Sequence, residues 1–199
     1  MTGPSILAFF VAAFLSLLEL VTSKYPQTSF LLWRSRAFYA YGFIYGLLAL
    51  GATLGLGALS ATGAIKLQGL GMSSPWVQAV AIGISFKALL HIRLFSVTTG
   101  SEAFPIGVET LVQLFEPSLT RKILLDHFNA LQGFIGPRAD KYRDLVNVKK
   151  NIADNIPELP AQEGTAFLMD IQQAASVRQA MELYLKLVGR PGFDRVFPP

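Results

Sequence analysis

The sequence predicts an all-α membrane protein, with three transmembrane helices followed by a cytoplasmic four-helix domain. Apolar residues make up 52% of the chain and charged residues only 15%, against roughly 25% charged residues in ordinary soluble domains. The charges are also unevenly distributed: residues 1–98 contain six basic and one acidic residue, and residues 99–199 contain eleven and twelve. We therefore expect a transmembrane domain over 1–98 and a cytoplasmic α-helical domain over 99–199.

Two apolar stretches, 5–22 and 37–59, are long enough to cross a membrane. A helix of 18 residues is about 27 Å long, close to the roughly 30 Å of a hydrocarbon core. Apolar residues cover every side of the first stretch, which is not typical of a helix in a soluble core. No Lys or Arg precedes this stretch, so we expect an uncleaved span rather than a secretory signal.

A third apolar stretch, 76–95, contains Lys87, His91 and Arg93. One interpretation is a full crossing in which the stem of Lys87 carries its charge towards the interface. The alternative is a shorter span that continues as an interfacial helix. We expect a crossing, which makes three spans in all.

Three crossings place the two termini on opposite sides of the membrane. The loop 23–36 carries three basic residues, whereas the loop 60–75 carries only Lys66. Positively charged loops stay in the cytoplasm, so the N-terminus is expected outside and the large C-terminal domain inside. The expected location is a prokaryotic inner or plasma membrane.

The second span contains two GxxxG pairs, Gly42 with Gly46 and Gly51 with Gly55. Nine positions separate the two pairs, which places them on opposite faces of a helix with 3.6 residues per turn. Small faces let helices approach closely in lipid. Either this span packs between the other two within one chain, or one face joins another protomer. We expect a homo-oligomer.

Charged side chains inside the membrane are the first candidates for function, because an isolated charge in lipid is costly. Glu19 lies near the cytoplasmic end of the first span, at a depth that Lys87 in the third can match. One interpretation is an ion pair between them that locks the two spans together. Another is that Lys87, His91 and Arg93 line a polar cavity or an oligomeric pore. Snorkelling to the interface is the third.

The second half of the sequence shows apolar residues at a period near 3.6, which predicts helices over 105–116, 117–135, 138–153 and 161–188. Pro117 suits a first helical turn, and Gly136 with Pro137 is a stop signal. The tail 189–199 is expected to be extended. The candidate core residues are Phe128, Phe134, Phe167, Met169, Leu183 and Leu185.

One short pattern suggests an enzyme. In the segment RKILLDH, Arg121 precedes His127 by six positions. This arrangement resembles the R-x(4–6)-H signature of the HEPN ribonucleases, an all-helical family that pairs across a dimer. The resemblance covers seven residues and implies that Arg121 and His127 are catalytic. The family usually has another polar residue directly after the Arg, a pattern that Lys122 fits only loosely. The alternative is two exposed polar residues on an amphipathic helix.

Other chemistry has little support in the residues. The chain has no cysteine and two histidines, and it contains no phosphate-binding loop and no HExxH motif. We therefore expect no metal and no cofactor. The basic excess lies in the apolar half, so direct nucleic-acid binding is not expected either. The expected partners are membrane lipids, further copies of the chain and a cytoplasmic protein.

The function predicted from these features is non-enzymatic. It is an oligomeric membrane protein whose cytoplasmic helices bind a partner or signal and whose spans transmit or carry out a membrane response, as in a prokaryotic defence-type sensor or effector subunit. One alternative is an ion channel or transporter subunit lined by Lys87 and His91. The HEPN-like ribonuclease is the other.

Overall fold

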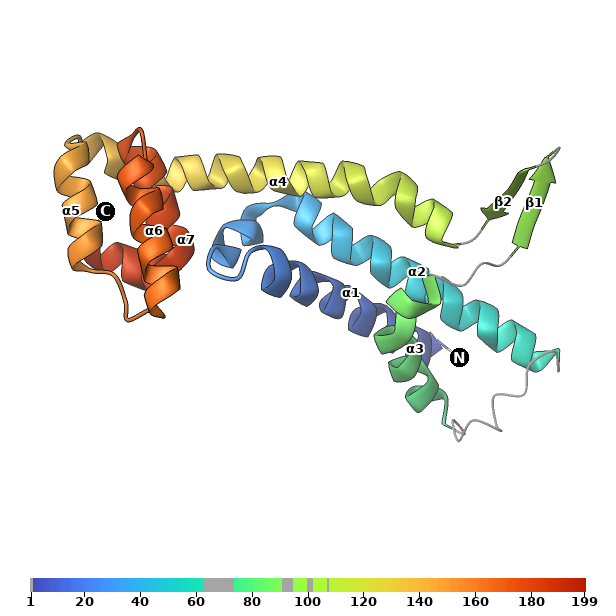
Figure 1. The fold of residues 1–199 in the computed structure, drawn as a ribbon. Coiled ribbons are helices and arrows are strands. Elements are labelled where there is room, and N and C mark those ends of the chain that lie inside the picture. Colours follow the sequence, from blue (N-terminus) through green and yellow to red (C-terminus); the bar gives the residue numbers. More distant parts are fainter. Residues whose placement is uncertain (1, 63–73, 91–94, 100–101, 107) are drawn as a thin grey trace. The chain divides into compact units, whose positions relative to one another are not determined.

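The computed structural model describes residues 2–62, 74–90, 95–99, 102–106 and 108–199, and their side chains over 3–62, 74–85 and 114–199 (Figure 1). The chain forms two compact units. The N-terminal unit comprises Met1–Lys24 and Arg36–Ile123, and the C-terminal unit comprises Tyr25–Ser35 and Leu124–Pro199. This division by compactness is distinct from the boundary between membrane and water expected near residue 98, which stays a prediction.

The N-terminal unit contains α1 (Thr2–Lys24), α2 (Arg36–Ala61) and α3 (Pro75–Leu90). The first two helices are long and apolar enough to cross a membrane, and they include the predicted spans 5–22 and 37–59. α3 has 16 residues, which is about 24 Å of helix. It ends at Leu90, and Phe95 begins a strand, so the predicted helical span 76–95 is wrong at its C-terminal end.

Helix α1 packs against both α2 and α3 (Figure 1). Its buried residues recur every three or four positions and are mostly small: Ser5, Ala8, Ala12, Ser16 and Leu20. Small side chains at this spacing form one face that lets a second helix approach closely. The opposite face of α1 carries Phe10 and Phe14, which are 62% and 64% exposed. An exposed aromatic face of this kind is typical of a surface covered by lipid or by another protein.

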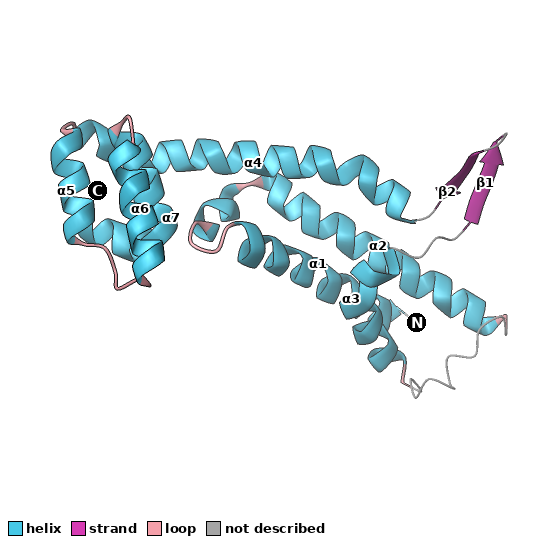
Figure 2. Ribbon diagram, in the orientation of Figure 1, coloured by secondary structure: helices cyan, strands magenta, loops and turns pink. Residues whose placement is uncertain are grey.

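Two short strands accompany the helices in the described part of the chain (Figure 2). Strands β1 (Phe95–Thr99) and β2 (Glu102–Ile106) pair antiparallel, with Phe95 opposite Ile106 and Thr99 opposite Glu102. The fold is helical as predicted, but this hairpin stands where the prediction had no strand and began a helix at residue 105. The β-branched residues of β1 favour the extended backbone.

Helix α4 (Val108–Lys141) is continuous, so the predicted breaks at Pro117 and at Gly136 with Pro137 are wrong. A proline inside a helix removes one backbone hydrogen bond, a cost that tertiary packing can outweigh. Past Pro137 this packing is evident, because Arg138 and Ala139 are both buried. Residues up to Ile123 belong to the N-terminal unit, and those from Leu124 belong to the C-terminal unit.

The C-terminal unit also contains α5 (Leu145–Asp154), α6 (Ala161–Gln173) and α7 (Val177–Val196). Asp144 caps α5 by accepting hydrogen bonds from the N–H groups of Val146 and Asn147. The helix predicted over 161–188 is in fact two helices, because Ser176 caps a new one. The predicted extended tail is also wrong, since α7 continues to Val196 through a kink at Gly189, where φ is 67°.

The core of the C-terminal unit is a cluster of apolar side chains from α4, α5, α6 and α7 and from the segment between α1 and α2. Of the predicted core residues, Leu185 is fully buried, and Phe134, Phe167 and Leu183 are partly buried against the cluster. Phe128 and Met169 are more than half exposed, so their assignment to the core is wrong. The spacing identified apolar helix faces but not which part of each face is covered.

Candidate functional site

The segment Tyr25–Ser35 joins the end of α1 to the start of α2 and belongs to the C-terminal unit. It contains a short 3-10 helix, η1 (Ser29–Arg34), which begins after a turn in which the Thr28 N–H donates to the Tyr25 carbonyl. Leu31 from this helix is part of the C-terminal core. The connection between the two membrane-type helices is therefore a structural component of the C-terminal unit rather than a free loop.

Two polar contacts anchor this segment to successive residues of α4. The imidazole Nε2 of His127 lies 2.9 Å from Thr28 Oγ1. The hydroxyl of Ser35 donates to Asp126 Oδ2 at 2.7 Å. Thr28, Ser35 and His127 are all buried. Buried polar groups need partners, and these contacts supply them across 99 and 91 positions of sequence.

The environment of His127 favours its neutral form. The Tyr25 ring lies against the imidazole, with 4.5 Å between ring centroids. Burial lowers the pKa of His127 below its ordinary value, and the positive charge of Lys186 acts in the same direction, while Glu182 opposes it. Protonation of His127 would therefore place a charge in a site built for a neutral ring.

The same segment also contacts α7 at its kink. A Cβ on Gly189 would lie 2.7 Å from Gln27 Oε1, so the Gln27 side chain would have to move, and the positive φ favours glycine at this position. The Phe30 ring packs edge-on against Phe134 of α4, and the guanidinium of Arg190 lies 5.5 Å from the centroid of Phe30. Tyr25–Ser35 is thus held between α4 and the kinked part of α7.

Arg138 holds the end of α7 against α4. Its Nε donates to the carbonyl of Phe197 at 3.0 Å, and its Nη2 forms a 2.6 Å ion pair with Asp194. The guanidinium also lies 4.1 Å from the centroid of the Phe134 ring. These contacts use the planar shape and the several donors of arginine, and they explain why the last residues are helical rather than extended.

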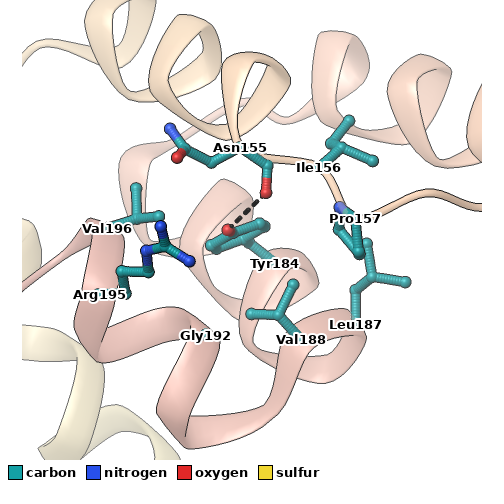
Figure 3. Close-up of a pocket in the computed structure, with 9 residues that line it drawn as sticks. All are labelled: Asn155, Ile156, Pro157, Tyr184, Leu187, Val188, Gly192, Arg195 and Val196. Atoms are coloured by element: carbon teal, nitrogen blue, oxygen red, sulfur yellow. Dashed lines mark hydrogen bonds between the residues drawn. The ribbon is translucent and has the colours of Figure 1, made fainter.

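A pocket of about 560 Å³ lies in the C-terminal unit (Figure 3). Residues after α5 form one side of it, and α7 forms the other. The lining residues are Asn155, Ile156, Pro157, Tyr184, Leu187, Val188, Gly192, Arg195 and Val196. The Tyr184 hydroxyl donates to the Asn155 carbonyl at 3.0 Å and so bridges the two sides. Arg195 is charged, and the other lining residues are neutral.

The two GxxxG pairs of α2 have different surroundings. A Cβ on Gly42 would lie 2.7 Å from Leu17 Cγ, and one on Gly46 would lie 2.7 Å from the Phe9 ring. This first pair therefore allows the close contact between α2 and α1. No described atom lies within 4 Å of the Cβ position of Gly51 or Gly55. The second pair is therefore open with respect to the residues that the structure describes.

The charged candidates of the membrane half are only partly described. Glu19 lies on an exposed position of α1. Lys87 lies in α3, but its side chain is outside the described residues, as are His91 and Arg93 altogether. The ion pair and the pore therefore stay predictions. In the same unit, Tyr41 of α2 donates to Glu116 Oε1 of α4 at 3.3 Å, a contact that no local pattern indicated.

The Arg and His of the HEPN-like pattern differ in exposure. Arg121 is exposed, whereas His127 is only 6% exposed and is held by Thr28 and Tyr25. The expectation that both are exposed surface residues is thus wrong for His127. Its imidazole is not presented to solvent, and the ribonuclease alternative stays a prediction.

Sequence reasoning did not find the anchored segment or the pocket. Thr28 and Ser35 are ordinary loop residues by composition, and their partners are about half the chain away. The local signals near the pocket are Pro157 and Gly192, residue types that indicate breaks in helices and not a binding site. Comparison of the chain with protein-family models, with curated proteins and with solved structures finds no match that would add to this description.

Proposed function

We propose that this chain is an oligomeric integral membrane protein whose C-terminal helical domain binds a partner or signal in the cytoplasm and whose membrane helices carry the response. The observation that supports this most is the segment Tyr25–Ser35. It directly connects the two helices that are long and apolar enough to span a membrane, and its side chains are built into the C-terminal unit.

The chain passes between the two units at three points, after Lys24, before Arg36 and after Ile123. The last of these lies inside the continuous helix α4. At the other two points, the chain enters the C-terminal unit from Lys24, the last residue of α1, and leaves it for Arg36, the first residue of α2. In this proposal, a change in the packing of the C-terminal unit reaches the ends of α1 and α2 through the residues that directly adjoin them in the sequence.

In this proposal α1, α2 and α3 are the three spans, with the N-terminus outside and the C-terminal domain in the cytoplasm. The exposed aromatic residues of α1 support contact with lipid. The basic residues Lys24, Arg34 and Arg36 around the first connection support its cytoplasmic location. α3 is the shortest span, and a local thinning of the bilayer costs only fractions of a kcal/mol per Å of mismatch.

The absence of cysteine in the sequence makes a labelling experiment simple. Ser60→Cys lies at the far end of α2, and Gln173→Cys lies at the end of α6. With a membrane-impermeant maleimide on intact cells, we expect labelling of Ser60→Cys only, and labelling of Gln173→Cys only after lysis. Labelling of Gln173→Cys in intact cells would overturn the orientation, and recovery of the chain in the soluble fraction would overturn membrane insertion.

The binding role requires a second test on the full chain. Purification in mild detergent, after crosslinking in cells, is expected to recover a cytoplasmic protein or a small molecule together with the chain. A separate variant, Ser35→Ala, tests transmission, because it removes the hydrogen bond from Ser35 to Asp126. We expect this variant to retain the co-purifying component but to lose the response that this component produces in the membrane. A response that is unchanged in Ser35→Ala would count against transmission through Tyr25–Ser35.

A further inference from the structure

We propose that the pocket between α7 and the residues after α5 is a binding site for a small, partly apolar molecule that carries one anionic group. The volume of about 560 Å³ lies within the range of about 300–1,000 Å³ that is usual for small-molecule sites. The argument rests on the charge of Arg195, on walls that combine polar and apolar surface, and on the position of the pocket beside the kink of α7.

Arg195 supplies the charge complementarity. The neighbouring cations of α7 are already paired, Arg190 with Asp194 at 3.3 Å and Lys186 with Glu182 at 2.7 Å. Among the residues that the structure describes, no carboxylate pairs with the Arg195 guanidinium. Arg195 is exposed, and Figure 3 shows its side chain beside Val196. An unpaired guanidinium presents several donors in one plane, a geometry that fits the two oxygens of an anionic group.

The walls of the pocket determine the rest of the ligand. Ile156, Pro157, Leu187 and Val188 contribute apolar surface, and polar atoms of the lining expose a similar area. The Tyr184 hydroxyl is engaged with the Asn155 carbonyl and the Asn155 amide with the carbonyl of Asn151, so few donors remain for a strongly polar molecule. With one cation in the lining, the site neutralises one negative charge and does not suit a polyphosphate.

The pocket borders the part of α7 that contacts Tyr25–Ser35. Val188 and Gly192, both in the lining, flank the kink at Gly189, and Gly189 contacts Gln27. A ligand against Val188 and Gly192 would therefore stabilise one geometry of this kink. This second step, from the pocket to the connection between α1 and α2, rests on the proposed function, whereas the binding site itself does not.

Binding is tested with the full chain in lipid nanodiscs and the probe 4-(trifluoromethyl)phenylacetate, followed by fluorine NMR line broadening. The neutral amide of the same acid is the matched probe. We expect the acid to bind and the amide to bind at least about tenfold more weakly. Empty nanodiscs measure partition of either probe into lipid.

The variant Arg195→Gln is expected to weaken binding of the acid to the level of the amide. Arg178→Gln is the matched control, since Arg178 is an exposed arginine whose pairing with Asp140 at 3.6 Å is also exposed. It is expected to bind the acid as the unchanged protein does. Equal binding of acid and amide, or unchanged binding in Arg195→Gln, would overturn the proposed site.

Transmission of a conformational change from the pocket to Tyr25–Ser35 is tested in a Trp76→Phe background. This background leaves Trp33 of η1 as the remaining tryptophan of the chain. We expect the acid to shift the emission of Trp33, and Arg195→Gln to abolish the shift. Binding without any change in Trp33 emission would overturn the transmission step alone. The maleimide experiment addresses membrane insertion separately, so failure of the site and failure of the proposed function give different results.

Discussion

At the scale of single residues, two buried polar side chains of α4 determine how the C-terminal unit is assembled. His127 fixes Tyr25–Ser35 through Thr28, and Arg138 fixes the end of α7 through Asp194 and the Phe197 carbonyl. Both side chains are buried and both have partners. Removing one member of such a pair leaves the other buried without a partner. The free energy lost in this way is larger than the net stabilisation that the pair provides.

Replacement of Arg138 tests this at one position. Arg138→Lys keeps the charge but cannot reach Asp194 and two backbone carbonyls at once, so we expect a loss of about 2–4 kcal/mol in the free energy of unfolding. Denaturant unfolding of the full chain in nanodiscs measures it. Arg178→Lys, at an exposed pair, is expected to change stability by less than about 1 kcal/mol. Similar losses in both variants would contradict the role assigned to Arg138.

The lowered pKa of His127 predicts a pH dependence. In the unfolded chain the imidazole titrates near 6.5, and in the folded chain it titrates lower. Between these two pKa values the unfolded state binds more protons, so stability is fully present above pH 6.5 and is lost as the pH falls below it, by at most about 1.4 kcal/mol per pH unit. The charged neighbours of the ring are Lys186 and Glu182.

Thermal unfolding of the chain in the Trp76→Phe background at several values between pH 5 and pH 8, followed by Trp33 emission, measures this dependence. His127→Gln keeps a polar group near Thr28 Oγ1 but does not titrate. We expect it to show a smaller loss of stability on acidification than the unchanged chain. An identical loss in the variant would assign the effect to other groups.

At the scale of elements, α4 and α7 both continue through residues that usually end helices. In α7 the backbone departs from helical geometry at Gly189 and then resumes, which brings Phe193 and Phe197 into the core. In α4, Arg138 and Ala139 contribute buried surface beyond Gly136 and Pro137. Burial of the residues that follow outweighs the local cost of each proline or glycine.

Two glycine substitutions with opposite expected effects test the kink. Gly189→Ala is expected to destabilise the chain by about 1–3 kcal/mol, because φ is positive and because Gln27 Oε1, 2.7 Å from the new methyl group, would have to move. Gly133→Ala on α4 has no described atom within 4 Å of its Cβ and should stabilise the chain by about 0.5–1 kcal/mol. Differential unfolding of the two variants in the same nanodiscs is the measurement. A neutral Gly189→Ala would show that the kink tolerates a side chain.

At the scale of the whole molecule, the glycines of α2 separate packing within the chain from packing between chains. Gly42 and Gly46 allow α1 to approach, while no described residue packs against Gly51 or Gly55 in the same way. The proposed oligomer would use the second pair. This assignment makes the two halves of α2 separable by mutation.

We expect Gly55→Ile to reduce self-association at least about tenfold while leaving the fold intact, because it adds a side chain only at the proposed contact between chains. Gly46→Ile should instead disrupt folding, since Phe9 already fills the space. Oligomeric state in mild detergent, measured by light scattering at several protein concentrations, distinguishes them. Unchanged self-association in Gly55→Ile would remove this face from the interface.

The sequence by itself determined the features that depend on the hydropathy and the apolar periodicity of neighbouring residues. The long apolar runs located α1 and α2, and apolar periodicity identified the second half as helical. The spacing of Gly42, Gly46, Gly51 and Gly55 predicts that the two pairs lie on different faces of the helix. Hydropathy and periodicity are properties of neighbouring residues, so they can be worked out without knowledge of the partner surfaces.

Only the tertiary structure decided where helices end and what the connection after α1 does. Pro117 and Gly136 carry the local signals of helix boundaries, yet α4 continues because of contacts made by later residues. Thr28 and Ser35 acquire their roles from His127 and Asp126, which lie 99 and 91 positions away. Contacts over such separations depend on how the elements pack, and their energies outweigh the roughly 1 kcal/mol preferences of single residues.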